Sequence, residues 1–317
     1  MGPIKVGVIG CGVWGRNHAR VYKELKNVTL AGVADSIHST AREIGERYKT
    51  SWYTDPTKII EDPEIQIISI CTPTITHAEI SHLAIEAGKN ILVEKPMANN
   101  VHEAIALIKA AKKHNVLLTV GFVERFNPAV QEAYKRISEG AIGDVILAHT
   151  RRVSRSPQRI GDIGVVKDLA IHDIDIINHL FDEDPETIFA VMGKIRHNYE
   201  DYANINISYS RNRNAFIETN WLTPRRIRTL TVTGTEGILN VEYTSQQITL
   251  ENNEMIMQPF LLYKEPLQEE LKSFVECVKA DKTPMVTGHD GLRALQICEA
   301  ALKSSDTKKM IKIDKLY

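Results

Sequence analysis

The chain has 317 residues, of which 43% are hydrophobic and 25% charged, and its formal net charge is −1. This is the balance of an ordinary globular protein that is long enough for two domains. No segment concentrates lysine and arginine as a nucleic-acid-binding surface does, and no apolar run approaches the ~20 residues that span a bilayer. We therefore expect neither nucleic acid nor a membrane as a partner.

Short β-branched runs alternate with amphipathic helical runs over the first 120 residues. The expected strands are 4–9, 30–34, 65–71, 90–93 and 117–121, and the expected helices are 17–25, 40–48, 76–87 and 101–114. Strands such as IQIISI are apolar throughout, as in a parallel sheet that is covered on both faces. The pattern predicts an α/β domain of the doubly wound, Rossmann type over residues 1–121.

The pattern changes after residue 122. Helices are expected at 128–139, 172–180, 267–280 and 288–304, a long strand at 144–153 and a short one at 310–313. Between residues 187 and 250, segments such as NINISYS and RTLTVTG alternate apolar and polar residues, which is typical of antiparallel strands. Residues 122–317 are therefore predicted to form an α+β domain with a mostly antiparallel sheet.

The four cysteines lie far apart and form no CxxC pair; they are Cys11, Cys71, Cys277 and Cys298. Isolated thiols are typical of proteins of the reducing cytosol. A strand-like run begins within a few residues of Met1, which leaves no room for a signal peptide. We therefore expect a cytoplasmic protein.

A glycine motif follows the first expected strand and opens the first expected helix. Gly10 permits a tight turn, Gly12 lets a pyrophosphate approach the backbone, and Gly15 lets the helix and strand pack closely. The N–H groups at the helix start then face the phosphates. The residues expected to bind a dinucleotide here are Gly10, Gly12, Val13, Trp14 and Gly15.

Asp35 ends the second expected strand, 20 residues after Gly15. A carboxylate at this position bonds the ribose hydroxyls and repels a 2′-phosphate, which favours NAD over NADP. Two alternatives stay open: Asp35 caps the next helix, or the glycine loop belongs to an S-adenosylmethionine enzyme.

Four further segments, in this order along the chain, resemble the Gfo/Idh/MocA (glucose–fructose oxidoreductase / inositol dehydrogenase) family. They are TPTITH at 72–77, EKP at 94–96, GFVERFNP at 121–128 and DLAIHDID at 168–175. Ala170 departs from the family, which usually has glycine there. The resemblance implies a Rossmann domain joined to an open-faced antiparallel sheet. It also implies further contacts to NAD from Thr72, Pro73, His77, Glu94, Lys95 and Arg125.

The same resemblance implies a catalytic group of Lys95, Asp168 and His172, which would also contact the substrate. Oxidation of a secondary alcohol sends a hydride to the nicotinamide while the hydroxyl loses a proton. Histidine suits that proton transfer, and a lysine ammonium stabilises the developing alkoxide. We take His172 as the base and Lys95 as its electrostatic partner, with the reverse assignment as the alternative. Asp168, His172 and Asp175 also match a metal-ligand set, but we expect no metal.

The segment WLTPRR at 221–226, followed by LTVTGTEG at 230–237, resembles the family branch that oxidises nucleotide-activated amino sugars. It implies oxidation of C3 of UDP-N-acetylglucosamine to the 3-keto sugar. Arg152 and Arg225 would then bind the diphosphate, because guanidinium groups form paired bonds to phosphate oxygens. The alternatives are that these arginines are a solvated face, that the substrate is a free polyol or aldose, and that the chain is a non-catalytic NAD-binding sensor.

The antiparallel sheet is expected to carry helices on one face. The other face would then expose apolar side chains unless a second subunit covered it, and large exposed apolar patches are unusual on monomers. The side chains expected there are Ile205, Ile207, Phe216 and Trp221. We therefore expect a homodimer or homotetramer, as the family resemblance also implies.

Overall fold

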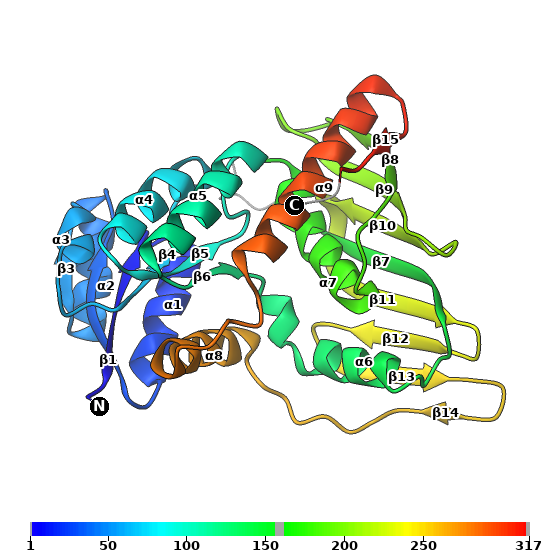
Figure 1. Cartoon of the computed structure of the whole chain (residues 1–317), viewed down its shortest axis with the longest axis horizontal. Helices are drawn as coiled ribbons and strands as arrows, with labels where there is room; N and C mark the ends of the chain where they lie inside the picture. Colours follow the sequence, from blue (N-terminus) through cyan, green and yellow to red (C-terminus); the bar gives the residue numbers. More distant parts are fainter. Residues whose placement is uncertain (1, 156–161, 315–317) are drawn as a thin grey trace. The chain divides into compact units, whose positions relative to one another are not determined.

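The computed structural model describes residues 2–155 and 162–314, which form two compact units (Figure 1). The first unit runs to Val123 and also includes Leu267–Leu292, and the second takes Glu124–Pro266 and the residues from Arg293 onward. The sequence placed one boundary near residue 121 and kept 122–317 together, so the return of Leu267–Leu292 to the first unit is a difference from that division.

The first unit is built on a six-stranded parallel sheet in the order β3-β2-β1-β4-β5-β6. Its strands are β1 (Ile4–Ile9), β2 (Val28–Ala34), β3 (Ser51–Tyr53), β4 (Ile67–Ile70), β5 (Asn90–Glu94) and β6 (Leu118–Gly121). The order reverses between β1 and β4, and in such sheets ligands bind at the carboxyl ends of the strands beside the reversal. The predicted Rossmann fold is confirmed.

Helices connect these strands: α1 (Val13–Glu24), α2 (His38–Tyr48), α3 (Thr57–Ile60), α4 (Thr74–Glu86) and α5 (Val101–His114). In helix α5, particular residues mark where the helix begins and ends. Asn100 accepts a hydrogen bond from the N–H of Glu103, and Glu103 in turn accepts one from the N–H of Asn99. Asn115 then ends the helix in the left-handed conformation, at φ 54°. Both signals can be read from the sequence.

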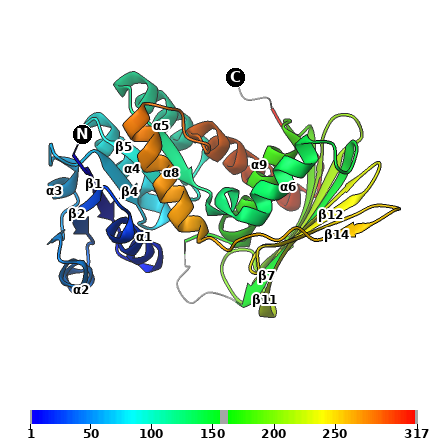
Figure 2. The ribbon, with the colours of Figure 1, turned by 90° about the horizontal axis from the view of Figure 1, so that it is seen from below.

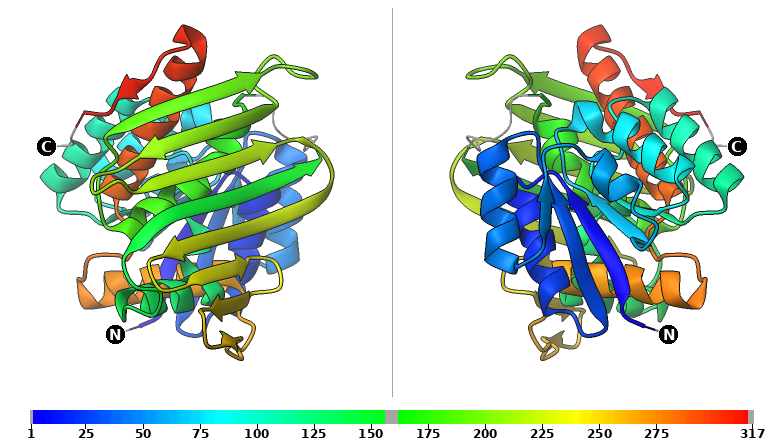
Figure 3. Two further views of the ribbon diagram at one scale, coloured as in Figure 1. Left: turned by 90° about the vertical axis from the view of Figure 1, so that its right-hand side faces the viewer. Right: turned by 90° about the vertical axis from the view of Figure 1, so that its left-hand side faces the viewer.

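Helix α8 (Pro266–Ala280) contributes to the core of the first unit although it lies far along the chain. Four of its side chains join the buried cluster formed by β1, α1 and β2, namely Leu267, Leu271, Phe274 and Val275. Figure 3 (right) shows α8 in orange running beside the blue elements. Within the described ranges, no helix is both long and apolar enough to cross a membrane.

The second unit contains a nine-stranded sheet in the order β14-β13-β12-β11-β7-β10-β9-β8-β15. Its strands are β7 (Val145–Arg155), β8 (Thr187–Gly193), β9 (Tyr202–Ser208), β10 (Asn214–Asn220), β11 (Leu222–Gly234), β12 (Ile238–Glu242), β13 (Gln247–Glu251), β14 (Ile256–Met257) and β15 (Ile311–Lys312). Neighbouring strands of this sheet run antiparallel, except β7 and β10, which run parallel. The predicted, mostly antiparallel sheet is therefore confirmed.

Helices of the second unit pack on this sheet: α6 (Pro128–Ser138) against β12 and β13, and α7 (Ile171–Phe181) against β7 and β10. Figure 2 shows α6 and the second half of α9 (Gly288–Thr307) on the same side of the strands. Figure 3 (left) shows the other side, on which no helix overlies the described strands.

The register of β9 and β10 corrects the expected outer face. Ile205 pairs with Ile217 and Ile207 with Ala215, so these residues share one face, and all four are fully buried. Trp221 is also buried, at 2% exposure, rather than outward-facing. Of the four apolar side chains expected outside, Phe216 alone is exposed. Its companions on the open face are Leu147, Phe189 and Val191.

Candidate active site

The glycine loop joins β1 to α1 in the first unit. Gly10 has φ +89°, and a Cβ there would lie 2.6 Å from the carbonyl carbon of Cys71. A Cβ on Gly15 would lie 1.7 Å from the carbonyl oxygen of Gly10, so both positions require glycine. Over Gly12, by contrast, nothing lies within 4 Å, and no side chain caps the start of α1. The loop thus offers open space at a helix N-terminus, which fits a pyrophosphate.

Asp35 lies beside this loop at the end of β2. Its Oδ2 accepts a hydrogen bond from the N–H of Cys11 at 2.7 Å, and its Oδ1 accepts one from the N–H of Ile37 at 2.9 Å. Ile37 is the residue before α2, and no side chain caps that helix, so the alternative in which Asp35 is its cap is not supported. A carboxylate has about four acceptor sites, so capacity remains for ribose hydroxyls. Burial and the charge of Asp35 together raise the pKa of the Cys11 thiol to about 12.

Thr72 and Pro73 lie in the loop after β4, across the sheet reversal from the glycine loop, and His77 lies in the first turn of the following helix α4. His77 is 1% exposed, and its ring nitrogens lie 2.8 Å from the carbonyl oxygens of Thr72 and Pro96. His77 therefore ties this loop to the one that contains Lys95. This position supports a role in shaping the cofactor loops.

Glu94 and Lys95 lie at the carboxyl end of β5. Glu94 is buried, and its Oε1 lies 3.1 Å from Nε2 of His18 on α1. Its Oε2 accepts the backbone N–H of Lys95 at 3.3 Å. Gly121 on β6 leaves room for this carboxylate, since a Cβ there would approach it to 3.1 Å. His18 was not predicted but contacts Glu94, an expected site residue; its signal in the sequence is a polar residue on the apolar face of α1.

Asp168 and His172 lie in the second unit, on one helical segment. A π-helical turn (Val166–Ala170) carries Asp168 and continues into α7, which carries His172. Asp168 is 3% and His172 7% exposed. Glu200 accepts the N–H of Val166 at 3.1 Å and so holds the start of the segment. Turns of this π type often occur at functional sites.

Arg125, expected at the cofactor, forms a paired ion bond with Asp175 of α7. Its Nε and Nη2 donate to the two carboxylate oxygens at 2.7 Å each, and both side chains are nearly fully buried. The contact of Arg125 with NAD stays a prediction. Lys95 belongs to the first unit, and Asp168, His172 and Arg125 belong to the second.

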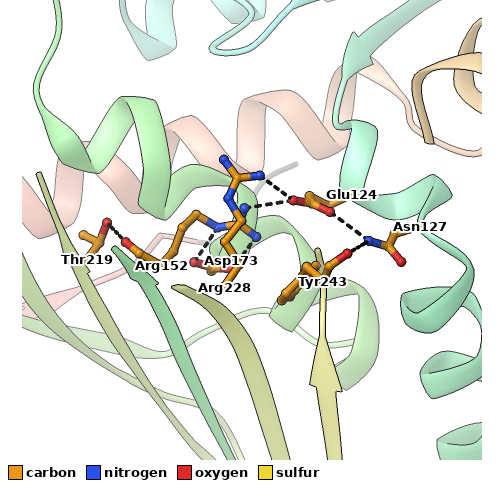
Figure 4. Close-up of polar contacts among 7 residues, drawn as sticks. All are labelled: Glu124, Asn127, Arg152, Asp173, Thr219, Arg228 and Tyr243. Carbon is orange, nitrogen blue, oxygen red and sulfur yellow. Dashed lines mark hydrogen bonds and ion pairs between the residues drawn. The ribbon is translucent and has the colours of Figure 1, made fainter. Parts of the chain in front are cut away.

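Arg152, expected at the substrate, is 1% exposed and lies in a buried charge cluster (Figure 4). Its Nε and Nη2 donate to Asp173 at 3.0 and 2.9 Å, and its Nη1 donates to Glu124 at 2.9 Å. Arg228 also donates to Glu124, at 3.1 Å. All three nitrogens of Arg152 therefore bond to protein carboxylates, whereas Arg225 is exposed.

Burial and charge oppose each other in this cluster. Burial raises the pKa of Glu124, but Arg152 and Arg228 outweigh it and hold that pKa below its ordinary value. For Asp173, burial outweighs Arg152 and the pKa lies above its ordinary value. Burial, together with the neighbouring Arg152, lowers the pKa of Arg228 to about 10. Among the described residues, no group of three or more His, Cys, Asp or Glu side chains is placed to hold a metal ion.

Comparison with known proteins matches both halves of the chain to one family. The NAD-binding Rossmann fold of the Gfo/Idh/MocA oxidoreductase family matches residues 4–122, and the GFO/IDH/MocA C-terminal domain matches residues 130–240. A myo-inositol 2-dehydrogenase from Thermotoga maritima is 29% identical over 99% of both chains. A UDP-N-acetylglucosamine 3-dehydrogenase from Acidithiobacillus ferrooxidans is 33% identical, over 59% of this chain and 58% of its own.

A solved structure shows the same fold. Levoglucosan dehydrogenase, in complex with NADH and levoglucosan, superposes with a TM-score of 0.93 at 22% identity and covers 99% of this chain and 100% of its own.

Proposed function

The chain belongs to the Gfo/Idh/MocA family of oxidoreductases, and we propose that, as an NAD-dependent sugar or polyol dehydrogenase, it oxidises a secondary hydroxyl of a free cyclic polyol of the inositol type. The observation that supports this substrate most is the similarity to myo-inositol 2-dehydrogenase, which extends over 99% of both chains. The burial of Arg152 supports it as well, because its side chain is 1% exposed and three of its five N–H groups already donate to carboxylates, which leaves little of the guanidinium accessible to a diphosphate.

A second candidate is C3 of UDP-N-acetylglucosamine, the substrate expected from the sequence. It is supported by the 33% identity to UDP-N-acetylglucosamine 3-dehydrogenase over part of the chain. The exposed Arg225 also supports it, because an exposed guanidinium is available to a phosphate. We do not assign Arg152 to the diphosphate, because it is buried among carboxylates.

In either case the alcohol carbon loses a hydride and its oxygen loses a proton, which leaves a ketone. NAD, when bound at the glycine loop, supplies the hydride acceptor. We assign the hydroxyl proton to His172, whose ordinary pKa near neutrality suits a general base. Lys95 stabilises the charge that develops on the oxygen, and Asp168 orients the imidazole or holds a neighbouring hydroxyl. The reverse assignment of base and electrostatic partner stays the alternative.

We further propose that the enzyme works as a homodimer or homotetramer in the cytoplasm. The exposed Leu147, Phe189, Val191 and Phe216 on the open sheet face support the assembly. The free state of the four cysteines fits a reducing compartment.

The test is to incubate the protein with NAD and either myo-inositol or UDP-N-acetylglucosamine and to follow the absorbance of NADH. We expect reduction with myo-inositol. Lys95→Met and His172→Gln should each lower kcat by about 10²- to 10⁴-fold, the range for loss of a general acid or base. Matched controls are Lys112→Met, an exposed lysine on α5, and His179→Gln, on the same helix as His172.

Reduction with UDP-N-acetylglucosamine alone would establish the second candidate instead. Full turnover of Lys95→Met would contradict the proposed site.

A further inference from the structure

Helix α7 is held by two paired ion bonds that come from different elements. Arg152 on β7 bonds both oxygens of Asp173, and Arg125 in the preceding 3₁₀ turn (Val123–Phe126) bonds both oxygens of Asp175. Each of these four side chains is at most 4% exposed. Helix α7 therefore carries two buried charged contacts.

The two contacts lie on nearly opposite sides of the helix. At about 100° per residue, Asp173 and Asp175 are about 160° apart around the axis, and residue 172 lies in the arc between them. A rotation of α7 by roughly 10° moves the end of a side chain, roughly 6 Å from the axis, by about 1 Å. Any such rotation stretches both ion bonds, so the two together fix the direction of His172.

Burial of these charges adds little to stability by itself. The desolvation of buried ions offsets most of their attraction, and apolar side chains of similar size often serve stability as well or better. What an ionic pair with two bonds adds is a fixed geometry. Glu124 completes this geometry. Its Oε1 accepts a hydrogen bond from Nη1 of Arg152, and its Oε2 accepts one from the side-chain amide of Asn127 (Figure 4).

We propose that Arg152 is a positioning residue that, through Asp173 and Glu124, fixes the rotation of α7 and thereby the place of the His172 imidazole. This rests on the proposed function, in which His172 accepts the hydroxyl proton. In this role Arg152 acts through Asp173 and Glu124, to which its guanidinium is bonded. Lysine does not replace it, because a single ammonium cannot present three nitrogens in the plane that both carboxylates require.

Arg152→Lys tests the proposal, with Arg151→Lys as the matched control. Arg151 is the preceding residue of β7, is 42% exposed and pairs with Glu218 on the opposite face of the sheet. Hydrogen exchange of the amides in 171–181 is compared with that of 202–208, in β9 of the same unit. We expect Arg152→Lys to speed exchange in 171–181 at least tenfold and to leave β9 unchanged. Arg151→Lys should alter neither.

The second readout follows His172 itself. Isotope-labelled histidine gives a ring signal that is assigned by its loss in His172→Gln, and its chemical shift and titration midpoint should change in Arg152→Lys but not in Arg151→Lys. With myo-inositol as substrate, kcat should fall about 10- to 100-fold, as expected for a displacement of about 1 Å. The KM for NAD should stay within twofold.

Uniformly faster exchange across the second unit, or an unchanged His172 signal, would overturn the proposal. If Arg152→Lys fails to fold, Glu124→Gln, which keeps the bonds between Arg152 and Asp173, is measured in the same way and should show the same pattern at smaller amplitude. If the wild-type protein reduces NAD with neither test substrate, the proposed function fails while the exchange and histidine measurements still decide the role of Arg152.

Discussion

Asp201 is a fully buried carboxylate that organises the turn after β8. It accepts the backbone N–H groups of Ile195, Arg196 and His197 and contacts the His197 ring. Burial alone would raise its pKa, but these donors outweigh burial and lower the pKa to about 2. Because the pKa in the folded state lies below the ordinary 3.8, this contact stabilises the fold above about pH 4 and the stabilisation is lost as the pH falls towards 2.

Asp201→Asn should therefore cost about 2 kcal/mol of unfolding free energy at pH 7, from a shift worth about 1.4 kcal/mol per pKa unit. The difference from the wild type should shrink steadily between pH 5 and pH 2. Urea unfolding at a series of pH values measures it, and a difference that does not depend on pH would contradict the assignment.

Replacement by alanine should have opposite effects at Gly12 and Gly15: at Gly12 it should weaken NAD binding, and at Gly15 it should lower stability. Gly12→Ala places a methyl group in open space, so the unfolding temperature of the protein without NAD should stay unchanged while its Kd for NAD rises at least tenfold. Gly15→Ala forces a Cβ to within 1.7 Å of the Gly10 carbonyl oxygen and should cost about 3 kcal/mol or more of stability. Fluorescence of the adjacent Trp14 reports NAD binding, and wild-type affinity in Gly12→Ala would argue against the proposed pyrophosphate position.

At this scale the sequence identified the residue types of the site but not their surroundings. A buried arginine such as Arg152 cannot be told from a phosphate-binding arginine in a sequence, because burial depends on which strand face points inward. Asp173 does carry a signal, since a charge within the apolar run IHDIDII needs a buried partner. The partner, Arg152, lies 21 residues earlier on strand β7 and cannot be read from that run.

At the scale of elements, long periodic segments were predicted well and short or special ones were not. Helix 101–114 was predicted to the residue, and in the structure Asn100 and Asn115 mark its ends. Strand β3, which has 3 residues, and helix α3, which has 4, were not predicted. The parallel pairing of β7 with β10 was also missed, because half-buried strands alternate in the same way in either direction.

The packing of helix α8 should be essential to the stability of the first unit. Phe274 is 2% exposed and packs in the core of the first unit with residues of β1 and α1. Phe274→Ala should lower the unfolding free energy by about 3–5 kcal/mol, the usual cost of removing a buried aromatic ring. Hydrogen exchange should then increase in β1 and β2 first. Exchange that increases in the nine-stranded sheet alone would contradict the place of α8.

At the scale of the whole molecule, we predict that copies of the chain assemble through the open face of the nine-stranded sheet. Phe189, Asn206, Phe216 and His149 form one row across four strands, and the His149 and Phe216 rings lie 5.3 Å apart. We expect native mass spectrometry to give a dimer or tetramer, and Phe216→Lys to shift the mass towards smaller species. Ile256→Lys, on the edge strand β14, should leave the mass unchanged. A monomeric wild-type protein would refute this assembly.

The return of Leu267–Leu292 to the first unit has a consequence for biosynthesis. A ribosome adds about 5–20 residues per second, and N-terminal domains generally fold first as they emerge. Here helix α8, which packs on the first strands, is translated some 140 residues after β6, the last strand of the parallel sheet. Until residues 266–280 have left the ribosome, the nascent Rossmann half therefore exposes the apolar surface that α8 covers.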